Sequence, residues 1–124
     1  MQSFERESMS IVTQGDGVDV RVEEAGGMAV GFCQFPAGAD WRPLLEGLEG
    51  DLCQCPHWGY MLKGRLRMHT PDGPKDYLAG QAFYWAPGHA GEAIEDCEYV
   101  DFSPVAELKA VNDHVNSRAQ RTSR

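Results

Sequence analysis

The sequence of 124 residues lacks any apolar run long enough to cross a bilayer. Its first ten residues, MQSFERESMS, carry charges where a secretion signal needs an apolar core. We therefore expect a cytoplasmic protein with no membrane partner. Because thiols stay reduced in the cytoplasm, the four cysteines are expected to be free side chains or metal ligands rather than a disulfide framework.

Positive charge is scarce, since 11 Lys and Arg residues stand against 19 Asp and Glu residues and leave a formal net charge of -8. Nucleic-acid binding needs a basic surface, so this balance argues against a nucleic-acid partner. Internal repeats, low-complexity segments and linkers are missing as well. With 42% hydrophobic and 24% charged residues, the chain is expected to form one domain over residues 1–124, with flexible ends at 1–8 and 117–124.

The chain does contain a series of short β-type segments separated by turn signals. Val18, Val20 and Val22 alternate with polar residues, and the apolar run Met28–Phe35 ends at a Pro-Ala-Gly turn. Residues 40–50 lack a clear period and are expected to form a loop or a short helical turn. Many short strands at regular spacing predict an all-β sandwich or barrel, with further strands at 9–13, 51–64, 65–69, 76–78, 81–85, 92–94 and 97–102.

Only the C-terminal segment has a helical pattern. Apolar residues recur at spacings of three to four from Val105 to Val115, and Ser103 and Pro104 suit the cap and the first position of a helix. A short C-terminal helix is therefore predicted to pack one stripe on the barrel or on a partner.

The stretch from Asp51 to Gly64, DLCQCPHWGYMLKG, concentrates the side chains that can bind a metal or carry redox chemistry. In an extended strand, residues two apart share a face, so Asp51, Cys53, Cys55 and His57 would project to one side. We expect this face to line a pocket.

The segments HWGYMLKGRLRM and LAGQAFYWAPGH resemble the two motifs of the cupin superfamily. The resemblance implies a small jelly-roll barrel, or double-stranded β-helix, that usually holds a divalent metal and forms homodimers. If Gly64 is the turn glycine of the first motif, the family's glutamate position falls on His57, and its two histidine positions fall on Cys53 and Asp51. The last histidine of the second motif would fall on Gly91, whereas this chain has His89 two residues earlier on the same strand face.

The alignment and the shared strand face together indicate a divergent ligand set, consisting of Cys53, Cys55, His57 and His89. Thiolates with imidazoles suit zinc or iron, and four protein ligands would make a closed structural site. If one cysteine stays free, three ligands leave a position open for catalysis. The residues also fit purely structural roles, because buried cysteines pack as small hydrophobes, a buried His57 can be satisfied by a hydrogen bond, and His89 fits an exposed turn.

A ligand pocket in the barrel is predicted to be lined by Asp51, Tyr60, Trp85 and Arg67, because barrel mouths are common binding sites. Arg67 could hold a substrate carboxylate or lie on a solvated strand face. Trp58 is out of phase with His57 and is expected on the opposite sheet face, where it fits a dimer interface.

Three functions agree with these features. The first is a metal-dependent enzyme acting on a small organic metabolite, of the oxygenase, isomerase or decarboxylase type found among cupins. The second is a non-catalytic module that binds or senses a small ligand. The third is a thiol redox protein using Cys53 and Cys55, although the sequence has no Cys-x-x-Cys motif.

Overall fold

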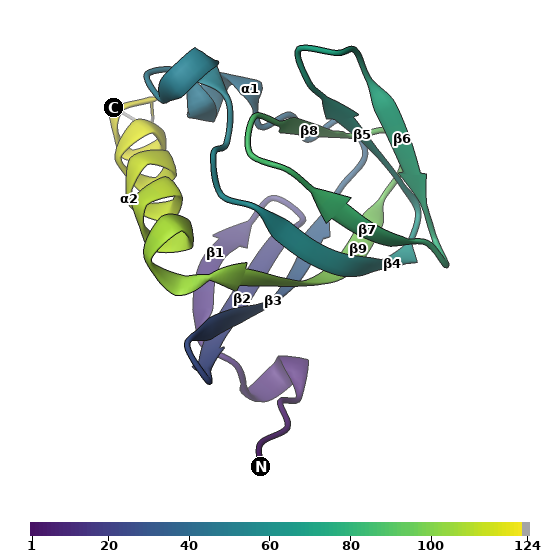
Figure 1. Cartoon of the computed structure of the whole chain (residues 1–124), viewed down its shortest axis with the longest axis vertical. Coiled ribbons are helices and arrows are strands. Elements are labelled where there is room, and N and C mark those ends of the chain that lie inside the picture. The colour runs from purple at the N-terminus through teal and green to yellow at the C-terminus, as the bar shows by residue number, and fades with distance from the viewer. Residues whose placement is uncertain (123–124) are drawn as a thin grey trace.

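The computed structural model describes residues 1–122, with side chains described as far as Arg118. Within this range the strands form a six-stranded sheet in the order β1-β2-β3-β9-β4-β7 and a three-stranded sheet in the order β6-β5-β8 (Figure 1). Every strand pair is antiparallel. The strands are β1 (Ile11–Gly15), β2 (Val18–Ala25), β3 (Met28–Phe35), β4 (His57–Lys63), β5 (Arg65–His69), β6 (Lys75–Leu78), β7 (Ala82–Trp85), β8 (Ala90–Ala93) and β9 (Cys97–Pro104).

The interior lies between the two sheets and is filled mainly by large apolar side chains. Strands β5 and β7 alternate buried and partly or fully exposed residues, as strands with one face on a core do. Phe83 and Trp85 stack with their ring centroids 3.6 Å apart, and Tyr99 meets Trp85 edge-on at 5.1 Å. The core cluster of buried residues comprises Cys33, Met61, Leu66, Met68, Phe83, Trp85, Ala93, Cys97 and Tyr99. The prediction of an all-β barrel is confirmed.

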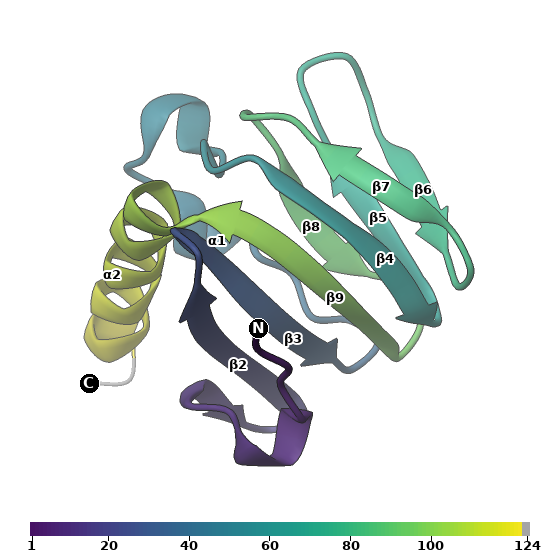
Figure 2. The same ribbon diagram turned by 60° about the horizontal axis from the view of Figure 1, so that its bottom comes forward.

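Most of the helical elements gather at one end of the barrel (Figure 2). These are the α-helices α1 (Arg42–Leu45) and α2 (Val105–Thr122) and the 3-10 helix η2 (Glu49–Asp51), whereas the 3-10 helix η1 (Arg6–Ser8) lies apart from them near the N-terminus. The predicted C-terminal helix is thus present, and residues 117–122, expected to belong to a flexible end, continue it. Residues 123–124 of that expected end lie outside the described residues. Among the described helices, none combines the length and the apolar character needed to cross a membrane.

Helices α1 and α2 pack together over a second apolar cluster, separate from the core between the sheets. Its buried members are Leu45, Cys53, Cys55 and Ala90. Leu108, Val111 and Val115 of α2 pack against them, which confirms the stripe predicted from the sequence. The cluster covers the end of the barrel where β4 begins.

The prediction that one extended strand begins at Asp51 is wrong, because β4 begins at His57. Asp51 belongs to η2 and has a positive φ of 58°. Its carboxylate accepts a hydrogen bond of 2.9 Å from the backbone N–H of Gly47, which stabilises a compact turn in place of a strand. Asp51, Cys53, Cys55 and His57 therefore do not form one straight row.

Candidate metal centre

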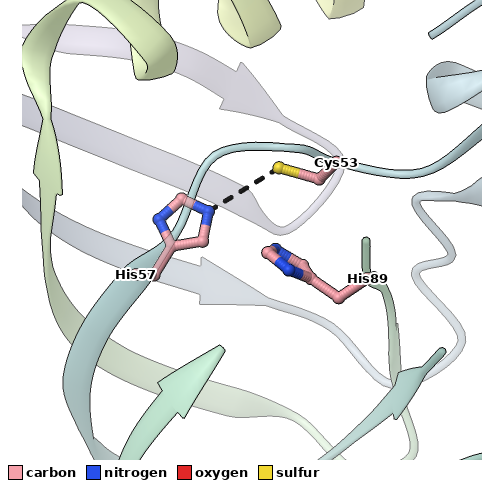
Figure 3. Close-up of side chains that lie close together, drawn as sticks. All are labelled: Cys53, His57 and His89. Atoms are coloured by element: carbon pink, nitrogen blue, oxygen red, sulfur yellow. Dashed lines mark hydrogen bonds between the residues drawn. The ribbon is translucent and has the colours of Figure 1, made fainter. Parts of the chain in front are cut away.

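Three of the residues singled out in the sequence converge at the helix-covered end of the barrel. The metal-ligating atoms of Cys53, His57 and His89 all lie within 4.8 Å of one another. Figure 3 shows the three side chains pointing toward a common space, with the Sγ atom of Cys53 3.7 Å from Nε2 of His57. Segments distant in the sequence supply these groups, since Cys53 precedes β4, His57 begins it and His89 precedes β8.

An isolated backbone bridge holds Cys53 beside His89. The N–H of Cys53 donates to the carbonyl of His89 at 2.8 Å, and the N–H of Gly88 donates back to the carbonyl of Cys53 at 2.8 Å. Because main-chain bonds fix both residues, their side chains approach each other without relying on loop packing. His57 is fixed separately by its place at the start of the central strand β4.

Hydrogen bonds at the two Nδ1 atoms orient the imidazole rings. Nδ1 of His89 lies 2.6 Å from the carbonyl oxygen of Ala86, which can only accept, so this nitrogen carries the proton. Nδ1 of His57 lies 2.6 Å from Oγ of Ser103 and 3.3 Å from Oδ2 of Asp101. The proton on Nδ1 of His89 leaves its Nε2 lone pair free, and a proton on Nδ1 of His57 would do the same, which is the arrangement of metal-ligating histidines.

Burial determines the protonation of the three groups. Cys53, His57 and His89 are 4%, 7% and 1% exposed. Desolvation lowers the pKa of His57 to about 3, with a smaller contribution from His89, and it also lowers the pKa of His89. Both imidazoles are therefore neutral near pH 7. Desolvation raises the pKa of the Cys53 thiol to about 11, so a metal ion would bind by displacing its proton.

The residues present fit a divalent metal ion. Nε2 of His89 is buried and has no hydrogen-bond partner among the described residues. A buried polar atom without a partner costs about 1–3 kcal/mol, so such an atom in a native fold calls for an explanation. A cation held by this nitrogen, by Nε2 of His57 and by the Cys53 sulfur would supply the missing partner.

Cys55 and Asp51 lie outside this three-residue group. Cys55 is fully buried in the cluster beneath α2, and its Sγ lies 3.5 Å from the carbonyl oxygen of Pro56. Asp51 is exposed and directs its carboxylate to the backbone of Gly47. The four cysteines are all free thiols.

The four residues predicted to line a ligand pocket are not brought together. Trp85 adjoins the metal centre, with its ring centroid 6.1 Å from that of His57 and 6.2 Å from that of His89. Tyr60 lies on the exposed face of the large sheet. Arg67, on β5, bonds to the carboxylate of Asp76 on β6.

Sequence reasoning missed two polar residues that contact the centre. Asp101 and Ser103 are 6% and 0% exposed, on the inner face of β9. Ser103 was predicted to cap the C-terminal helix, but its hydroxyl contacts His57 and the helix begins at Val105. The available signal was the alternation in 97–103, which places a carboxylate and a hydroxyl on the same strand face as Cys97 and Tyr99.

Comparison with known proteins supports the fold. No protein-family model matches the sequence, and no curated protein matches it significantly. Among solved structures, an oxalate decarboxylase variant from Bacillus subtilis is 19% identical, with a TM-score of 0.63 over 82% of this chain. This chain spans only 28% of the length of that decarboxylase chain.

Two smaller proteins match over nearly their full length. An RmlC-like cupin from Shewanella frigidimarina is 19% identical, with a TM-score of 0.60 over 82% of this chain and 88% of the other. KdgF from a Halomonas species is 20% identical, with a TM-score of 0.61 over 84% of this chain and 94% of the other. These likenesses show that the chain has the cupin fold, as the two sequence motifs implied.

Proposed function

We propose that this protein is a small metal-binding cupin that acts on a small organic metabolite, through chemistry of the oxygenase, isomerase or decarboxylase type. The observation that carries the proposal is the convergence of Cys53, His57 and His89, whose ligating atoms lie within 4.8 Å of one another. The names of similar structures include an oxalate decarboxylase, which supports an enzymatic role for this fold without selecting the reaction.

Zinc or iron suits the donor set, because one thiolate and two imidazoles are ligands of intermediate softness. Three protein ligands leave a position of the ion open, which is typical of catalytic rather than structural sites. An ion in this position would supply Lewis-acid chemistry to a bound substrate. The proposal also implies a reducing compartment such as the cytoplasm, where Cys53 stays a thiol.

The surroundings favour a substrate with an apolar body and an oxygen atom that accepts hydrogen bonds. Aromatic rings adjoin the centre, and the indole Nε1 atoms of Trp41 and Trp85 are buried without a hydrogen-bond partner in the described chain. Each indole N–H is a donor only. A carbonyl or carboxylate oxygen would satisfy such a group.

A second candidate is a non-catalytic protein whose metal has a structural role. The near-complete burial of the three ligands beneath the α1–α2 cluster favours it, because a substrate would need a path past these helices. A thiol redox function has less support. Burial raises the pKa of Cys55 to about 12, so its reactive thiolate form is rare near neutral pH.

Metal content of untagged protein tests the proposal. We expect about one zinc or iron per chain in the wild type, by elemental analysis, and loss of that metal in Cys53→Ser, His57→Ala and His89→Ala. His114→Ala is the matched control, because His114 on α2 bonds to the backbone carbonyl of Glu46 and does not belong to the ligand group. Wild type that stays metal-free after incubation with Zn²⁺, Fe²⁺, Mn²⁺ and Ni²⁺ would contradict the proposal.

Cobalt substitution separates the enzyme from the structural alternative. In the Co²⁺ form, an open coordination position predicts that azide or a small carboxylate shifts the visible absorption bands. A spectrum that these ligands leave unchanged would favour a closed, structural ion. Only a shift of the Co²⁺ absorption bands would justify a search for substrates.

A further inference from the structure

We propose that Asp101 and Ser103 are positioning residues that hold His57 in the tautomer and orientation needed to bind a metal ion. The inference rests on the proposed metal-binding function and assigns a role to two residues outside the ligand set. Nδ1 of His57 lies 2.6 Å from Oγ of Ser103 and 3.3 Å from Oδ2 of Asp101. With its proton shared between these acceptors, the ring presents the lone pair of Nε2 to Cys53 and His89.

The sheet around Asp101 is built to admit a carboxylate. In the strand register, Asp101 lies opposite Gly31 of β3 and opposite Gly59 of β4. A Cβ atom at Gly31 would collide with Oδ1 of Asp101, and one at Gly59 would collide with the backbone at Val100 and with the ring of Phe83. Neither glycine has a positive φ, so close approach rather than backbone conformation accounts for them. Gly31 thus leaves the space that the Asp101 side chain occupies, whereas Gly59 makes room for the backbone of β9 and for Phe83.

The negative charge of the buried Asp101 side chain also fits a nearby metal ion. In the described chain, the one basic side chain within 4.0 Å of the Asp101 carboxyl group is His57, which is neutral near pH 7, and the side chain of Asp101 is 9% exposed. A buried carboxylate without a cation is expensive, so such groups in native proteins are normally paired or coordinate a metal. A divalent ion on the far side of the imidazole would offset the negative charge, and the carboxylate would strengthen His57 as a ligand.

Ser103 is itself fixed in place. It lies on β9 opposite Ala29 of β3, its side chain is fully buried, and its Oγ lies 2.6 Å from Nδ1 of His57. The hydroxyl oxygen can therefore accept from Nδ1, and burial keeps water from replacing it as the partner.

The test compares zinc affinity, measured by competition with a chelator, with the melting temperature of the metal-free protein. Asp101→Asn and Ser103→Ala are each expected to weaken zinc binding roughly 10- to 100-fold. A positioning role predicts this loss without a matching fall in the melting temperature. The Co²⁺ spectrum should keep its thiolate bands in both variants, because Cys53 is untouched.

Asp19→Asn is the matched control, because Asp19 is also a nearly buried strand aspartate but pairs with Arg21, away from the centre. It should lower the melting temperature and leave zinc affinity unchanged. Zinc affinities of Asp101→Asn and Ser103→Ala within twofold of wild type would overturn the inference, and so would losses that only follow the melting temperature.

Nitrogen NMR of the metal-free protein provides a readout that does not depend on metal. The inference predicts that His57 is protonated at Nδ1 in the wild type and that a variant combining Asp101→Asn with Ser103→Ala populates the Nε2-protonated form. If the wild type binds no metal, the proposed function fails, and this measurement still decides the present inference. An Nε2-protonated His57 in the wild type would overturn it.

Discussion

At the scale of single residues, Asp101 and His57 give the metal-free protein opposing responses to pH. Burial raises the pKa of Asp101 from 3.8 to about 7 and lowers the pKa of His57 from 6.5 to about 3. The stability contributed by Asp101 is fully present below pH 3.8 and is lost as pH rises through about 7. The stability contributed by His57 is present above pH 6.5 and is lost as pH falls toward 3.

Replacing Asp101 with Asn removes the first of these responses. Relative to wild type, the metal-free Asp101→Asn variant should gain stability as pH rises from about 4 to about 8. Each pH unit between the pKa values of Asp101 in the unfolded and folded chain, 3.8 and about 7, is worth about 1.4 kcal/mol, so the full change is about 4 kcal/mol. Urea unfolding in the presence of a chelator measures it.

Asp19→Asn provides a control of opposite sign. The hydrogen bond from Arg21 lowers the pKa of Asp19, so its stabilising effect is present above pH 3.8 and is lost as pH falls below that value. This variant should therefore be less stable than wild type near neutral pH, with a difference that shrinks in acid.

Parallel pH profiles for wild type and Asp101→Asn would contradict the assignment of Asp101 as a buried, uncompensated carboxyl group.

At the scale of elements, the turn between β4 and β5 depends on Gly64. Its φ is +79°, and a Cβ atom there would collide with the carbonyl of Asp96. Gly64→Ala should therefore destabilise the protein by more than the ~1 kcal/mol of an ordinary left-handed glycine. Gly26→Ala is the matched control, since Gly26 has a φ of +59° with open space around it. Equal melting temperatures for the two variants would argue against a close approach at Gly64.

Local pattern predicted the regular elements well, because period-two alternation and turn residues act over a few positions. The apolar strand Met28–Phe35 has the bounds expected from the sequence. The segment before β4 was misjudged, since the positive φ of Asp51 depends on a side-chain bond to Gly47 rather than on any period. The pairing of Cys53 with His89 is a long-range backbone bridge, and periodicity carries no information about it.

The candidate site was predicted only in part for the same reason, namely that local pattern carries no information about long-range contacts. Residue type and the cupin motifs were enough to single out Cys53, His57 and His89, because few side chains bind metals. Cys55 was grouped with them on the assumption of an extended strand, which the structure does not contain at that point. Asp101 was overlooked because its partner lies on another strand and is recognisable only once the register is known.

At the scale of the whole molecule, the outer face of the large sheet carries an apolar row across β3, β9, β4 and β7. One row of cross-strand neighbours runs from Val30 through Phe102 and Trp58 to Tyr84. Trp58 and Tyr84 stack with ring centroids 5.0 Å apart, although they are 46% and 52% exposed. This is the sheet face on which the sequence predicted Trp58 to lie. Contiguous exposed aromatic side chains are typical of protein–protein contacts.

We expect this face to form the homodimer that the sequence predicted, with Trp58 and Tyr84 near its centre. Because each chain carries a formal net charge of -8 while the aromatic row is uncharged, added salt should screen the repulsion between chains and favour the dimer. Sedimentation velocity on Tyr84→Glu should show a monomer. Leu78→Glu is the matched control, since Leu78 is 44% exposed but lies on β6 in the other sheet. A dimer that survives Tyr84→Glu and dissociates with Leu78→Glu would place the interface on the small sheet. A wild type that stays monomeric at every salt concentration would show that the aromatic face does not form a homodimer.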